Sequence, residues 1–244
     1  EVVERPASIV KELVENAVDA GATKVTVEIQ GGGIQYIRVT DNGTGIARED
    51  VENAFLRHAT SKVKNEEDLT RIMTMGFRGE ALASIAAMCR VELLTRTAEE
   101  IAGTRYTISG GEPGELSDAG CPTGTTITVR DVFFNTPARM KFLKKDVSEG
   151  NSVAAAVEKA ALGNPGVAVK FLRDGVVRLQ TPGDGQVLSA VRCVLGREFS
   201  ENAVPVRYEA NGLTLDGVIS RPSFARGSRG LQNFFINTRF VRSK

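Results

Sequence analysis

The chain has 244 residues, of which 41% are hydrophobic, enough to bury a sizeable core in one large domain or two modest ones. Its 31 basic and 30 acidic residues nearly cancel, which excludes a generally basic surface and leaves nucleic-acid binding undecided. Three cysteines without a C-x-x-C pair indicate free thiols in a reducing compartment, and the single histidine excludes multi-histidine metal sites. No stretch has the pattern of a membrane span or a signal peptide.

The first predicted element is a helix in K-E-L-V-E-N-A-V-D-A-G-A, residues 11–22, which Gly21 is expected to end. At about 100° per residue, its polar residues form one narrow stripe and its apolar residues form the opposite side. The stripe consists of Glu12, Glu15, Asn16 and Asp19. Like charges three or four residues apart on a helix repel each other, so this stripe raises the question of what stabilises it.

Further elements follow from the periodicity of apolar residues. Strand patterns cover residues 24–29, 34–40, 90–96, 104–109, 124–132, 167–172, 176–180, 203–209, 213–219 and 233–237. Helical patterns cover 48–59, 80–88, 148–163 and 186–195, with a turn and short helix at 135–143. Residues 60–79 are polar and punctuated by glycine, which predicts a long loop of the kind that forms a functional lid or is disordered. Residues 181–185 are the best linker candidate.

Two glycine-containing motifs suggest a ligand pocket, although each is weak alone. In D-N-G-T-G-I, Asp41 is a candidate acceptor for an exocyclic amine, while Gly43 and Gly45 allow the backbone to come close to a ligand. A plain turn is the alternative explanation. In G-F-R-G-E, residues 76–80, two glycines at a helix start present backbone N–H groups that suit phosphate, and an ordinary helix cap is the alternative.

The acidic stripe also has two explanations, a solvated helix face or a site where a divalent cation and a phosphate compensate the charge. Mg²⁺ prefers oxygen ligands and binds few protein groups beside substrate phosphates, so the Asn16 side-chain carbonyl is a candidate ligand. Glu12 is a candidate general base for water that attacks a terminal phosphate. G-T-T at 124–126 either places a hydroxyl on a ligand or reflects β-propensity.

The order of these motifs resembles that of the GHKL (Bergerat) ATPase superfamily, which includes gyrase-type topoisomerase subunits, histidine kinases and the mismatch-repair MutL proteins. Five strings in particular resemble the N-terminal ATPase region of the MutL family, and the resemblance covers essentially the whole chain. The strings are E-V-V-E-R-P-A-S-I-V-K-E-L-V-E-N-A-V-D-A-G-A (1–22), D-N-G-T-G-I (41–46), R-H-A-T-S-K (57–62), G-F-R-G-E-A-L-A-S-I (76–85) and N-T-P-A-R-M-K-F-L (135–143).

The resemblance implies roles for residues of the opening helix. Glu12 matches the general base that activates water, and Asn16 matches the protein ligand of Mg²⁺. Glu15 and Asp19 match no catalytic residue, and we expect Asp19 to satisfy neighbouring polar groups. His58 is expected to be structural.

The resemblance also implies a nucleotide pocket. Asp41 matches the aspartate that binds the adenine amino group, Thr125 matches a threonine that supports the adenine, and Gly43 and Gly45 match glycines that shape the pocket. The ATP lid of the family matches residues 57–79, which are expected to order on nucleotide binding. The residues expected near the phosphates, mostly through backbone amides, are Thr60, Ser61, Lys62, Gly76, Phe77, Arg78 and Gly79.

The implied fold is α+β, an α/β sandwich with a Bergerat-type mixed sheet and helices on one face, followed by a ribosomal-S5-like α/β domain. We expect the first domain to cover residues 1–182 and the second to cover 186–244. In the family, a short segment precedes the position that corresponds to Glu1. The second domain of the family also contains an H-P-x-K segment beyond the position of the last residue, so we expect this domain to be truncated here. The family pattern N-G-R or N-K-R is N-T-R in this chain, at residues 237–239.

The function that this resemblance implies is Mg²⁺-dependent binding and slow hydrolysis of ATP, which drives lid ordering and N-terminal dimerisation of a DNA mismatch repair protein. The implied partners are ATP, a second copy of the chain, weakly and non-specifically bound DNA, the mismatch-recognition protein MutS and other repair factors. The implied location is the bacterial cytoplasm, in association with the nucleoid.

Two other functions compete with this one. A nucleotide-responsive DNA-binding or interaction module with negligible turnover would use basic residues such as Arg139, Lys141, Lys144 and Lys145, unless these form a solvated charge run. Such DNA binding would weaken as salt rises. A sensor-kinase ATP-binding domain is disfavoured, because the lid strings belong to the repair proteins and the chain continues into a second α/β domain.

Overall fold

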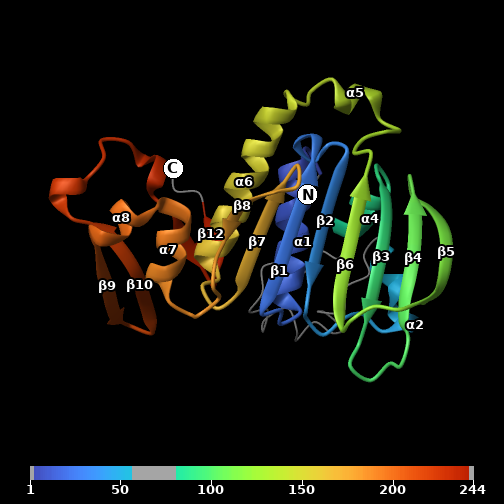
Figure 1. The fold of residues 1–244 in the computed structure, drawn as a ribbon, viewed down its shortest axis with the longest axis horizontal. Coiled ribbons are helices and arrows are strands. Elements are labelled where there is room, and N and C mark those ends of the chain that lie inside the picture. The colour runs from blue at the N-terminus through green and yellow to red at the C-terminus, as the bar shows by residue number, and fades with distance from the viewer. Residues whose placement is uncertain (1–2, 57–80, 242–244) are drawn as a thin grey trace.

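The structure, a computed structural model, describes residues 3–56 and 81–241. Its main strands are β1 (Lys24–Gln30), β2 (Tyr36–Asp41), β3 (Arg90–Arg96), β4 (Gly103–Ser109), β5 (Glu112–Ala119), β6 (Gly124–Arg130), β7 (Ala168–Arg173) and β8 (Val176–Gln180). They form one eight-stranded sheet in the order β5-β4-β3-β6-β2-β1-β7-β8 (Figure 1). β1 and β7 run parallel, and the other neighbouring pairs described in this sheet run antiparallel. The expected mixed sheet is therefore confirmed.

One face of the sheet carries the core, because apolar and polar residues alternate along the central strands. In β1, Val25, Val27 and Ile29 are buried, while the residues between them point to the other face. The strand registers align inward residues in one row across six strands, formed by Phe171, Val27, Val39, Ile127, Leu93 and Tyr106. The opposite face carries polar pairs such as Arg38 with Glu28.

Two long helices pack against each other beside this core, α1 (Pro6–Asp19) and α6 (Asp146–Gly163). α1 starts with a proline, which suits the first turn because its missing N–H is not needed there. It begins five residues before the predicted start, and its apolar side is buried as predicted. Gly21, just past its end, has a φ of 73°, the left-handed conformation that ends helices. The short helices α2 (Arg48–Val51), α4 (Ala81–Ala86) and α5 (Pro137–Met140) also belong to this part.

The rest of the chain forms smaller units next to β8 and α6, on the side of the sheet farthest from β5 (Figure 1). It contains α7 (Val187–Leu195), α8 (Arg197–Glu201), β9 (Ala203–Ala210), β10 (Leu213–Ser220), β11 (Phe234–Ile236) and β12 (Arg239–Val241). β9 pairs with β10 and β11 pairs with β12, each as an antiparallel hairpin. No helix in the described ranges is long and apolar enough to cross a membrane.

Within the described ranges, the structure also departs from the predicted elements at β5, α8, β12 and residues 48–59. β5 was not predicted, because its sequence E-P-G-E-L-S-D-A contains proline and glycine, which an edge strand tolerates and a periodicity search rejects. α8 and β12 are too short to show a period. The helix predicted over 48–59 ends at Val51 and is followed by a 3-10 turn, Asn53–Phe55.

Candidate active site

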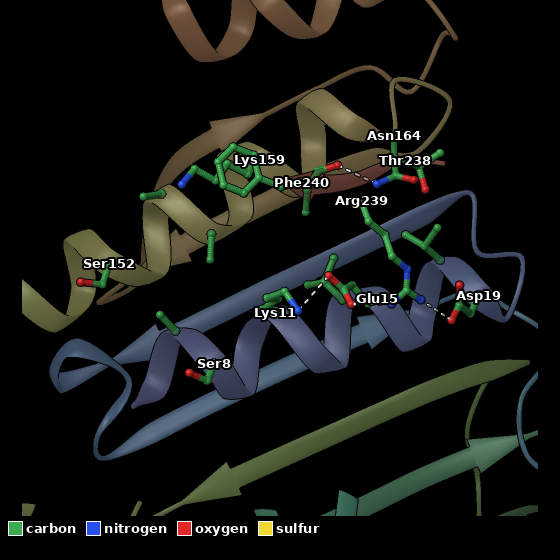
Figure 2. A pocket seen from close by; sticks show the side chains of 16 residues that line it. Ser8, Lys11, Glu15, Asp19, Ser152, Lys159, Asn164, Thr238, Arg239 and Phe240 are labelled. Carbon is green, nitrogen blue, oxygen red and sulfur yellow. Dashed lines mark hydrogen bonds and ion pairs between the residues drawn. The ribbon is translucent and has the colours of Figure 1, made fainter. Parts of the chain in front are cut away.

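The polar stripe of α1 divides into two sides in the structure. Glu15 and Asp19 face a cavity of about 270 Å³ that α1 shares with α6 and β12, shown in Figure 2. Glu12 and Asn16 do not line that cavity. Asn16 is exposed, and the Glu12 side chain is 29% exposed. The stripe is therefore not one uniform acidic surface, and its two candidate functional residues share the other side of the helix.

Lys11 lies between the two sides of the stripe. Its Nζ is 3.3 Å from Glu12 Oε1 and 3.2 Å from Glu15 Oε1. Burial acts to lower the pKa of Lys11, but the charges and hydrogen bonds of Glu12 and Glu15 outweigh it, so that pKa is raised. Lys11 therefore stays protonated and compensates part of the acidic stripe from within the chain.

Asp41 lies at the end of β2 and is held by backbone donors. Its Oδ1 accepts hydrogen bonds from Gly43 N at 2.8 Å and from Thr125 N at 3.3 Å. Among the described residues, no hydrogen bond reaches Asp41 Oδ2. Burial raises the pKa of Asp41, although the N–H groups of Gly43 and Thr125 act to lower it. A carboxylate that lacks solvent in this way gains from one more donor, such as a ligand amine.

The loop after Asp41 is fixed against the C-terminal end of α1. Thr44 N donates to the Ala20 carbonyl at 3.0 Å, and a Cβ on Gly43 would lie 2.8 Å from that same oxygen. Gly45 has a φ of 76°, and a Cβ there would lie 2.2 Å from the Arg96 carbonyl oxygen. Both predicted glycines are thus needed for close backbone packing, which brings Asp41 and the end of α1 together.

Sequence reasoning missed two residues that support Asp41. Gly124 has a φ of 121°, and a Cβ there would lie 2.2 Å from the Asp41 carbonyl oxygen. Thr95 is fully buried, and its hydroxyl contacts Thr125 Oγ1 at 3.2 Å and accepts from Ile46 N at 2.8 Å. Gly124 was visible in the G-T-T motif, whereas a threonine inside a strand gives no signal in the sequence.

The predicted phosphate-binding residues Thr60, Ser61, Lys62, Gly76, Phe77, Arg78 and Gly79 lie outside the described residues. Within the described ranges, no group of three or more His, Cys, Asp or Glu side chains is arranged to hold a metal ion. A cation bound by the exposed amide of Asn16 would therefore need ligand oxygens from another source, such as phosphates and waters. This donor set fits Mg²⁺, which is typically bound together with a substrate phosphate.

The class of the protein follows from this site and from comparison with known families. Residues 4–110 match the family model of the histidine kinase-, DNA gyrase B-, and HSP90-like ATPases, which places this part of the chain in the GHKL class. Residues 191–244 match the family model of the C-terminal domain of DNA mismatch repair proteins. Both parts of the expected architecture thus correspond to known families.

Individual relatives narrow the class further. The DNA mismatch repair protein MutL of Agathobacter rectalis is 49% identical over 243 residues, which cover 100% of this chain and 38% of that protein. MutL of Caldanaerobacter subterraneus subsp. tengcongensis is 46% identical, with 100% and 41% covered. The Aquifex aeolicus MutL ATPase domain complexed with ADP has a TM-score of 0.77 at 34% identity, with 100% of this chain and 85% of that chain covered.

The chain belongs to the MutL family of DNA mismatch repair proteins. It spans about two fifths of the length of the curated relatives it matches, 38% and 41% in the two cases above.

Proposed function

We propose that this chain binds ATP together with Mg²⁺ and hydrolyses it slowly. The observation that carries the proposal is the Asp41 carboxylate, which backbone N–H groups hold through Oδ1 beside the end of α1. This arrangement suits an adenine amino group, which would donate to Oδ2. The ADP complex of the Aquifex aeolicus relative supports a nucleotide as the ligand.

In this proposal the residues of α1 act on the phosphate end of the nucleotide. Glu12 accepts the proton of the water that attacks the terminal phosphate, as a general base. Asn16 offers its side-chain oxygen to Mg²⁺, which when bound neutralises charge on the phosphates. Backbone amides of the two lid motifs would complete the phosphate contacts, at Thr60, Ser61, Lys62, Gly76, Phe77, Arg78 and Gly79.

Two substitutions separate binding from hydrolysis. In Asp41→Asn, the amide oxygen would accept from Gly43 and Thr125, which would turn the NH₂ group toward the adenine amine. Two donors would then face each other, and ATP affinity is expected to fall by at least about tenfold. Glu12→Ala is expected to keep ATP affinity and to lose at least about a hundredfold in hydrolysis.

Isothermal titration and a phosphate-release assay measure these two quantities on the same samples. Glu112→Ala, which removes an exposed carboxylate on the edge strand β5, is the control and should behave as wild type. Wild-type hydrolysis by Glu12→Ala would show that the general base lies elsewhere. Wild-type ATP affinity in Asp41→Asn would remove Asp41 from the pocket.

We further propose that ATP orders the lid over residues 57–79 and drives dimerisation of the N-terminal region. The resemblance of the lid strings to the family motifs supports this proposal. A non-hydrolysable ATP analogue with Mg²⁺ is expected to protect this segment from protease and to increase the sedimentation coefficient. Equal cleavage with and without the analogue would contradict lid ordering, and an unchanged sedimentation coefficient would contradict dimerisation.

We also propose that the protein binds DNA weakly and non-specifically. It would contact MutS and other repair factors in the bacterial cytoplasm. Arg139 is a weaker candidate for a DNA contact than the three lysines, because its side chain donates a hydrogen bond to the Val3 carbonyl at 2.9 Å. Lys141, Lys144 and Lys145 are exposed. Replacing these three lysines with alanine should weaken DNA binding and flatten its salt dependence, and an unchanged salt slope would count against them.

A module that binds nucleotide and DNA with negligible turnover is the alternative function. In this alternative the nucleotide also binds beside Asp41, but Glu12 does not act as a general base. The hydrolysis assay decides between the two, because a wild-type rate no higher than that of Glu12→Ala would favour the alternative.

A further inference from the structure

The β11–β12 hairpin is seated directly on the C-terminal end of α6. A Cβ on Gly163 would lie 2.4 Å from the Thr238 carbonyl oxygen and 2.8 Å from the Phe235 ring, so the helix and the hairpin touch where a side chain is missing. Lys159 Nζ lies 4.0 Å from the centroid of the Phe240 ring, within the range of a cation–π contact. The hairpin is thereby placed next to α1, the neighbour of α6.

Arg239 of β12 reaches from this hairpin to α1, as Figure 2 shows. Its Nη1 donates to Glu15 Oε2 and its Nη2 donates to Asp19 Oδ2, each at 3.0 Å. The three side chains are only 16% to 21% exposed, so the contact is better shielded from water than an ordinary surface ion pair. The planar guanidinium suits this task because its rigid fork can hold two carboxylates at once.

The Arg239 contact continues along α1 to Glu12. Glu15 accepts from Arg239 through Oε2, and its Oε1 lies 3.2 Å from Lys11 Nζ. The same Nζ lies 3.3 Å from Glu12 Oε1. We call this series of four groups, Arg239, Glu15, Lys11 and Glu12, the charge chain. If Arg239 were removed, Lys11 would be the remaining cation beside Glu15 among the described residues. Glu15 would then attract Lys11 more strongly and draw it away from Glu12.

We propose that Arg239 is a positioning residue for ATP turnover, which acts on Glu12 through the charge chain. The inference rests on the proposed function, in which Glu12 is the general base. If Arg239 acts in this way, the rate of hydrolysis depends on the position of the β11–β12 hairpin relative to α1. The two elements are far apart in the sequence. The Arg239 contact also explains the acidic stripe, because Glu15 and Asp19 are held by an arginine from outside the helix.

The first test compares three arginine variants in the full-length protein. Arg239→Gln is expected to lower kcat about tenfold, the loss that about 1.4 kcal/mol of barrier produces. The KM for ATP and the affinity for ADP are expected to stay within about twofold, because the Asp41 pocket is untouched. Arg239→Lys keeps the charge without the fork and should recover part of kcat. Arg197→Gln, which removes an exposed arginine of α8 paired with Glu201, is the control and should match wild type.

Wild-type kcat in Arg239→Gln would overturn the inference. Equal losses of kcat and ADP affinity would also overturn it, because they would indicate general damage to the fold. The route through Glu15 is tested by adding Glu15→Gln. If Arg239 acts through Glu15, the kcat of the double variant should lie within about twofold of the kcat of the slower single variant. A loss of kcat equal to the product of the two single losses would contradict the charge chain.

A second test leaves every member of the charge chain intact. Gly163→Ala would push the Thr238 carbonyl away and shift the hairpin, and it should reproduce the loss of kcat seen in Arg239→Gln. Gly166→Ala is the matched control, because a Cβ there meets nothing within 4 Å. Equal kcat in these two glycine variants would overturn the dependence on hairpin seating. This comparison also covers the case in which Arg239→Gln fails to fold.

The Glu12→Ala variant separates failure of this inference from failure of the proposed function. Full hydrolysis by Glu12→Ala would contradict the proposed function itself. Lost hydrolysis in Glu12→Ala together with full activity in Arg239→Gln would contradict the charge chain alone.

Discussion

The eight-stranded sheet and the hairpins beyond residue 186 differ sharply in how they bury apolar side chains. In the sheet, Phe171 and Leu93 are 1% and 0% exposed, and six strands share one apolar row. In the β9–β10 hairpin, Leu213 and Leu215 are 75% and 55% exposed. Both regions have well-formed strands, so strand pairing alone does not produce a core.

Removal of one apolar side chain should therefore destabilise the sheet more than the β9–β10 hairpin. The sheet has helices packed on its apolar face, and each inward residue loses its contact with water. The β9–β10 hairpin has two strands, and a two-stranded ribbon has too little area to bury its own apolar residues. The eight-stranded sheet is therefore stabilised by its core. The β11–β12 hairpin, which carries Arg239, is instead held by a few specific contacts with α6 and α1.

The largest expected effect comes from removing a central side chain of the sheet. Phe171→Ala should lower the free energy of unfolding by about 3 to 5 kcal/mol, because it leaves a cavity in the apolar row. Leu215→Ala, in the exposed hairpin, should change it by no more than about 0.5 kcal/mol. Urea denaturation followed by circular dichroism measures both. Similar losses in the two variants would contradict the contrast between the regions.

An intermediate effect is expected at two glycines with positive φ, Gly124 and Gly212. Gly124→Ala should cost about 3 kcal/mol and abolish tight ATP binding, since its Cβ would collide with the Asp41 carbonyl and its φ is 121°. Gly212→Ala in the β9–β10 turn has a φ of 75° and open space, so strain alone should cost about 1 kcal/mol. Urea denaturation measures the stability of both variants, and ATP titration measures their affinity. Loss of ATP affinity in Gly212→Ala would contradict the expected difference between the sheet and the β9–β10 hairpin.

The smallest expected effect is a gain in stability at the β11–β12 turn. Ile236 pairs with Arg239, so Asn237 and Thr238 form a two-residue turn, with φ values of 47° and 68°. A β-branched residue is strained there, whereas Asn is tolerated. Thr238→Gly should therefore stabilise the hairpin by about 0.5 to 1 kcal/mol, and Asn237→Gly by less. Hydrogen exchange of the β12 amides measures this, and faster exchange in Thr238→Gly would contradict the strain.

Much of the sheet could be predicted because its strands and α1 have strong local periods. Alternation predicted β1, β2, β6, β7 and β8, and the apolar side of α1 was predicted correctly. β5 was missed because edge strands tolerate proline and charge. For the candidate site, Asp41, Gly43 and Gly45 were predicted from one short motif, and the structure packs their backbone closely. Thr95 supports Asp41 only through a contact made across the sheet, which no motif predicts.

The family, the candidate residues of α1 and the motif around Asp41 can be read from the amino-acid sequence, because each depends on residues that are neighbours along the chain. The sequence posed the problem of the acidic stripe without solving it. The cations that compensate the stripe are visible in the folded protein alone, because Arg239 contacts Glu15 and Asp19 after the chain has folded back on α1. Local repulsion is set by helix spacing, but its compensation depends on which distant strand comes to lie beside the helix.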